Sequence, residues 1–92
     1  MGAPILAVAW LREADYPTFR RLDPAGLPAS YDEWLRNAER GLEEFKRQGL
    51  VFEIVEIDPK ELVRWCRARG AKVDGRARMR LAVEIAHRRR QN

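Results

Sequence analysis

The sequence predicts a small α/β domain in which four helices cover a two-stranded sheet, in the order β-α-α-β-α-α. Two short segments, 5–11 and 50–57, are rich in apolar residues and have the length of strands. Each is followed by two helix-start signals, and these four signals are Asp15, Ser30, Asp58 and Asp74. The 92 residues have the size of one domain, so we expect residues 1–92 to form a single unit. An α+β arrangement is the alternative.

The first half of the chain begins with an apolar segment and a short helix. Segment 5–11 is apolar at successive positions, which is typical of a strand covered on both faces. Asp15 is expected to cap a short helix with Pro17 in its first turn. Asp23, which precedes a proline, is expected to end this helix.

The second predicted helix has the clearest signals in the chain. Ser30 and Glu33 form a capping box at its start, and Gly49 is expected to end it. Apolar residues at helical spacing give it one continuous apolar stripe, made of Tyr31, Trp34, Leu35, Ala38, Leu42 and Phe45.

The second half repeats the order strand, helix, helix. Segment 50–57 is rich in β-branched and aromatic residues, and Asp58-Pro59 follows it as a helix start. This helix is expected to stop at Gly70, and Asp74 to cap a last helix over about 75–89. We expect residues 88–92 to fray.

The connection between the two strands predicts their orientation and an association. Two helices make it long enough for a crossover, so the strands are expected to be parallel. A two-stranded sheet is marginal alone and leaves two open edges. Pairing with a second copy would extend the sheet, so we expect a homodimer.

Charge divides the chain into an acidic body and a basic end. Residues 1–59 contain 7 Lys and Arg against 11 Asp and Glu, and residues 60–92 contain 11 against 3. Exposed arginines of the last helix and the tail are candidate contacts for a polyanion, and these are Arg76, Arg80, Arg88 and Arg89. The last two helices also have roughly the arrangement of a helix-turn-helix unit. Glu84 interrupts this basic face, so nucleic-acid binding is the alternative and a solvated charged face is favoured.

Arg78 is the fifth candidate binding residue, and its position is unusual. Helical spacing places it within the apolar stripe of the last helix, where a charge needs a partner or a route to water. Three accounts stay open. The side chain extends to the surface, or it pairs with a carboxylate such as Glu13, Asp15 or Glu56, or it lines a pocket for an anionic ligand.

Enzyme chemistry finds little support in the sequence. His87 is the only histidine, and it lies near the basic C-terminus. Cys66 is the only cysteine and falls on an apolar helix stripe, where a buried thiol is favoured over a nucleophile. No metal-ligand cluster, phosphate loop or dinucleotide turn is present, so no catalytic residue, metal or cofactor is predicted. A small toxin-like nuclease working with Arg and Tyr is the weaker alternative.

Composition and hydropathy favour a cytoplasmic protein. No apolar run approaches the roughly 20 residues of a membrane span, so no membrane association is expected. A lone cysteine excludes an intramolecular disulfide, which suits a reducing compartment. The sequence therefore favours a non-catalytic binding or self-associating module, which binds a second copy of itself and a protein partner.

Overall fold

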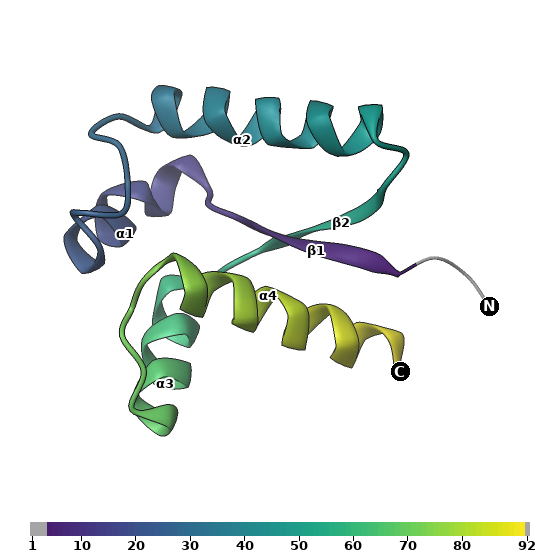
Figure 1. Ribbon diagram of the computed structural model, residues 1–92. Helices are drawn as coiled ribbons and strands as arrows, with labels where there is room; N and C mark the ends of the chain where they lie inside the picture. The colour runs from purple at the N-terminus through teal and green to yellow at the C-terminus, as the bar shows by residue number, and fades with distance from the viewer. Residues whose placement is uncertain (1–3, 92) are drawn as a thin grey trace.

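The computed structural model describes residues 4–91 and confirms the predicted small α/β fold. Its elements follow the predicted order (Figure 1). They are β1 (Ile5–Trp10), η1 (Glu13–Asp15), α1 (Tyr16–Leu22), α2 (Tyr31–Arg47), β2 (Val51–Glu56), α3 (Pro59–Arg69) and α4 (Gly75–Arg90).

The two strands are parallel, as predicted, and their register is regular. Ile5 lies opposite Val51, and Trp10 lies opposite Glu56. Side chains alternate between the two faces of a sheet, so the two faces carry different sets. One face carries Ile5, Ala7, Ala9, Val51, Glu53 and Val55, and the other carries Leu6, Val8, Trp10, Phe52, Ile54 and Glu56.

Helix α4 covers the first of these faces and forms the core of the protein with it. The strands lie between α2 and α4 (Figure 1). Ala7 and Ala9 of β1 pack against a buried cluster to which α4 contributes Leu81 and three alanines. The largest fully buried side chains are Phe19, Leu11, Ile57, Leu62, Leu81, Val55 and Cys66. The core therefore lies between the sheet and the helices α1, α3 and α4.

Helix α2 lies over the other face and is packed much less closely. None of its residues is buried. Its contacts with the sheet side include Trp34 against Trp10 (ring centroids 5.1 Å apart) and Phe45 against Phe52 (6.2 Å). The Tyr31 hydroxyl donates to the Leu11 carbonyl at 3.0 Å. The layer between α2 and the sheet is therefore only half closed.

Three of the four predicted helix caps are confirmed. Ser30, Asp58 and Asp74 each accept a hydrogen bond from a backbone N–H of the first helical turn. Asp15 is different, because it makes no capping bond and pairs with Arg12 at 2.8 Å. Its backbone is already helical as the last residue of η1, whereas a capping residue needs an extended backbone.

The last helix extends almost to the end of the chain. Arg88 to Arg90 form the last turn of α4, and only Asn92 of the predicted tail lies outside the described residues. Arg88 pairs with Glu61 at 3.2 Å, and both Arg89 and Arg90 pair with Glu53, at 3.4 and 2.9 Å. These pairs and the helix dipole favour cations in this turn.

The packing of α4 predicts a sharp contrast between two of its apolar residues. Leu81→Ala removes a fully buried side chain, so we expect the free energy of unfolding to fall by about 2–4 kcal/mol. Met79→Ala changes an exposed side chain on the same helix, and we expect a change below about 0.5 kcal/mol. Urea unfolding followed by circular dichroism measures both. Equal losses would contradict this orientation of α4.

Candidate functional site

Arg78 is buried in α4 and forms an ion pair with Asp23 at the end of α1. The Nη1 atom lies 2.9 Å from the Asp23 Oδ2 atom, and the two side chains are only 10% and 12% exposed. This geometry corresponds to the paired account of Arg78. The partner is none of the three carboxylates named from the sequence. It comes from the residue that ends α1, where the sequence indicated only a helix stop.

Two glycines leave room for this ion pair. The Gly26 N–H donates to the Asp23 Oδ1 atom at 3.1 Å. A Cβ atom on Gly26 would lie 2.3 Å from the Asp23 Oδ2 atom, which is a clash. A Cβ atom on Gly75 would lie 3.3 Å from the Arg78 Nη2 atom. The pair therefore ties the loop after α1 to the first turn of α4, and its charges satisfy one another.

The other four predicted arginines do not converge on one site. Arg88 and Arg89 are engaged by Glu61 and Glu53. Arg76 is exposed at the start of α4, and Arg80 lies over the Trp65 ring. Within the described residues, neither Arg76 nor Arg80 has a carboxylate within 4 Å of its guanidinium nitrogens. The basic half is thus divided into paired and unpaired cations.

Two hollows beside α3 share one of its arginines. Arg64 and Arg88 line a small hollow beside Trp65. Arg64 also lines a second hollow together with Arg67 and Lys60, and α1 contributes Thr18 to that hollow. The basic residues of the C-terminal half are therefore distributed over several hollows.

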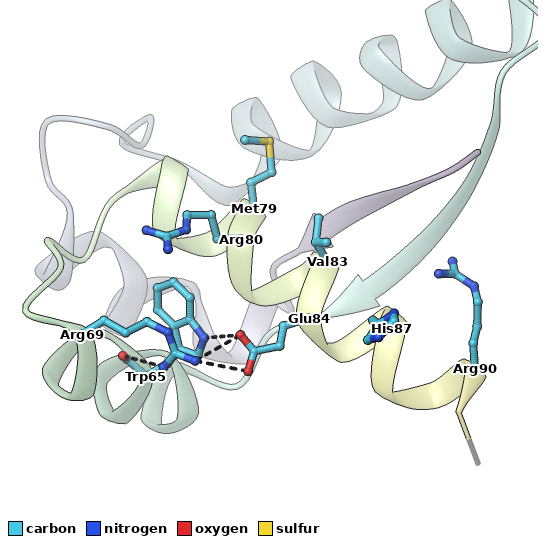
Figure 2. A pocket seen from close by; sticks show the side chains of 8 residues that line it. All are labelled: Trp65, Arg69, Met79, Arg80, Val83, Glu84, His87 and Arg90. Carbon is cyan, nitrogen blue, oxygen red and sulfur yellow. Dashed lines mark hydrogen bonds and ion pairs between the residues drawn. The ribbon is translucent and has the colours of Figure 1, made fainter. Parts of the chain in front are cut away.

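An open groove between α3 and α4 brings together the residues with the most suggestive chemistry (Figure 2). The Trp65 Nε1–H donates to the Glu84 Oε2 atom at 2.8 Å. The Arg69 Nη2 atom donates to both Glu84 oxygens, at 3.3 and 3.2 Å. The guanidinium carbons of Arg69 and Arg80 lie 4.2 and 5.0 Å from the centroid of the Trp65 ring, within cation–π range.

Sequence reasoning found only Arg80 of this groove. Glu84 was interpreted only as an interruption of the basic face. The structure gives Glu84 a different part, because it anchors the indole of Trp65 and the guanidinium of Arg69. The spacing of Trp65 and Arg69, one helical turn apart, was the signal in the sequence.

The two tyrosines, which were considered for nuclease chemistry, make hydrogen bonds that stabilise the fold. The hydroxyl of Tyr16 donates to the Pro28 carbonyl at 2.5 Å, and that of Tyr31 donates to the Leu11 carbonyl. Burial raises the pKa of both tyrosines, which disfavours their phenolate forms.

Cys66 and His87 differ in their exposure to solvent. Cys66 is buried, and its thiol donates to the Lys72 carbonyl at 3.5 Å. Burial raises the pKa of the Cys66 thiol, and the negative charge of Asp74 adds to the rise. His87 is exposed, with its Nε2 atom 3.0 Å from the amide nitrogen of Gln91.

Comparisons with known proteins assign no family to the chain. No protein-family model, curated protein or solved structure matches it. Among residues 4–91, no helix is long and apolar enough to cross a membrane. In the same part of the chain, no three His, Cys, Asp or Glu side chains are grouped in a way that could hold a metal ion.

The burial of the Arg78–Asp23 pair predicts a large cost of breaking it. Arg78→Met leaves the Asp23 carboxylate without its partner, so we expect the free energy of unfolding to fall by about 3 kcal/mol. Arg76→Met on the same helix is the control and should change it by less than about 0.5 kcal/mol. Urea unfolding of Arg78→Met, of Asp23→Asn and of the variant with both changes measures the coupling energy of the pair. Unchanged stability of Arg78→Met would show that the side chain merely extends to water.

The burial and raised pKa of Cys66 predict an unreactive thiol. At pH 8 we expect the native protein to react with a disulfide reagent such as DTNB more than about tenfold slower than a free cysteine. In urea the same thiol should react at the rate of the free amino acid. A fast reaction of the native protein would show an accessible thiolate.

Proposed function

We propose that the protein is a non-catalytic binding module of the cytoplasm that acts through self-association, as a symmetric homodimer joined along β1. The exposed surface of the chain carries this proposal. Its accessible area is 6358 Å². A monomeric protein of 10.7 kDa exposes about 5,500 Å². The excess, about 850 Å², is close to the roughly 800 Å² that each partner buries in a standard interface.

Charge distinguishes the two open edges of the sheet. β1 has the sequence ILAVAW, without a charged residue, whereas β2 carries Glu53 and Glu56. Charged residues protect an edge strand against pairing with another chain. The unprotected edge is therefore that of β1, and a second copy is the partner that fits it best.

The hydrogen bonds between β1 and β2 indicate which backbone groups of β1 are free to pair with another chain. The Ile57 N–H donates to the Trp10 carbonyl, which therefore points toward β2. In a regular parallel ladder this orientation alternates, so the N–H and C=O groups of Ala7 and Ala9 point toward the open edge. Both alanines remain partly exposed, although Val55, which lies opposite Ala9, is completely buried.

A two-fold axis at Val8 would satisfy these groups. Antiparallel pairing with Val8 opposite Val8 of the second copy places Ala7 opposite Ala9 of that copy, and the reverse. Each such pair exchanges two hydrogen bonds, and the result is a four-stranded sheet. The same pairing places the second copy beside Leu6, Val8 and Trp10, which the half-closed α2 layer leaves partly exposed.

Self-association along β1 predicts the mass of the protein and the effect of a proline. At tens of micromolar, analytical ultracentrifugation should give twice the 10.7 kDa of the chain. Ala7→Pro removes an N–H that the β1–β2 ladder does not use, so the variant should fold and sediment as a monomer. A monomeric native protein at this concentration would overturn the proposal.

Ile54→Pro on β2 is the matched control. By the same alternation the Ile54 N–H points toward the other open edge, so this variant should stay dimeric. Circular dichroism checks that both proline variants keep the native helix content. A monomeric Ile54→Pro beside a dimeric Ala7→Pro would place the interface on β2 instead.

A further inference from the structure

The groove between α3 and α4 has an apolar floor that the protein does not cover. Met79 and Val83 are 55% and 53% exposed, and Figure 2 shows both projecting outward from α4. The indole of Trp65 lines the same groove, which has a volume of about 530 Å³. This volume is in the range of small-ligand sites.

The charges along the groove do not balance. Among residues 4–91, Glu84 is the only acidic residue that lines it, and its carboxylate is taken up by Trp65 and Arg69. Arg80 lies over the Trp65 ring, and within the described part of the chain no carboxylate lies within 4 Å of its guanidinium nitrogens. This cation–π contact leaves the N–H groups of the guanidinium available. Such a planar group binds a carboxylate with two parallel hydrogen bonds.

We propose that this groove binds a short acidic peptide segment that carries large apolar side chains. A carboxylate of the segment would pair with Arg80. Its apolar side chains would cover Met79 and Val83, which flank Arg80 in the sequence and lie within one helical turn of it. The groove shares no residue with the β1 edge, so this binding is independent of self-association.

The length of the groove sets the length of the segment. Its α4 side reaches from Met79 to Arg90, which is about 16 Å along a helix axis. An extended peptide of about five residues spans this distance.

Paired cations favour a peptide over a nucleic acid at this site. Arg69 and Arg90 are already engaged by Glu84 and Glu53. A phosphate backbone draws its affinity from several free cations, whereas the described residues of the groove offer one, Arg80, beside exposed apolar side chains. A peptide with both carboxylates and apolar side chains matches both parts of the groove.

The test uses a panel of hexapeptides in which Glu alternates with an apolar residue. The members differ in whether Glu comes first or second and in whether each apolar position is Leu or Phe. Binding is followed by the NMR shift of the Trp65 indole N–H, which is assigned with Trp65→Phe. We expect at least one member to shift this resonance. Two variants should weaken its binding about tenfold, Arg80→Gln through the lost carboxylate pair and Val83→Ser through the lost apolar contact.

The controls separate the proposed recognition from general charge attraction. Arg76→Gln changes an exposed arginine of α4 outside the groove and should leave the affinity unchanged. Peptides with Lys in place of Glu, or Ser in place of Leu and Phe, should not bind.

The proposal is overturned if no member shifts the resonance at millimolar concentration, or if Arg80→Gln binds as well as the native protein. It is also overturned if a short single-stranded oligonucleotide binds more tightly than every peptide. The Ala7→Pro variant should give the same affinity, which keeps this result apart from that of the dimer.

Discussion

The packing of α4 across the sheet is the contact on which the rest of the structure depends. Three alanines of α4 are buried, and Ala7 and Ala9 of β1 pack against the same core. Short side chains on both elements let the helix approach the strand closely, so dispersion contacts form between α4 and this part of β1. From this one helix, Arg78 reaches the end of α1 and Glu84 reaches Trp65 of α3. A displacement of α4 would break both connections, so its position determines those of α1 and α3.

Helix α2 shows what happens without such a contact. It has the Ser30 cap, acidic residues in its first turn, basic residues in its last turn and the ion pair between Glu44 and Arg47. These features stabilise a helix locally, but most helical stability in proteins comes from burying an apolar face. In α2 that face is only partly covered, because the contacts with the sheet run through a few aromatic rings such as Trp34 and Phe45. A long apolar stripe left in this state is understandable if a second molecule completes the layer.

Most of the local structure could be predicted from the sequence, because it is decided by neighbouring residues. The cap at Ser30, the proline after Asp58 and the glycine stop at Gly70 all act within one helical turn. Long-range partners could not be predicted in this way. Nothing near Arg78 indicates that its carboxylate would come from 55 residues away, and the pairs that order the last turn of α4 join it to β2 and α3. The groove was missed for the same reason, because the indole of Trp65 and the carboxylate of Glu84 meet only once α3 and α4 are packed.

The division of charge along the chain now has a structural explanation. Asp23 and Glu53 belong to the acidic half, and their partners Arg78, Arg89 and Arg90 belong to the basic half, so these pairs join one half to the other. A cation that holds the fold together in this way has less charge to offer a polyanion, which weakens the nucleic-acid interpretation of the basic end. Arg80 is different, because it is held by an aromatic ring and not by a carboxylate. An external carboxylate is the group that would complete its surroundings, and the exposed apolar residues beside it would favour a ligand with apolar side chains of its own.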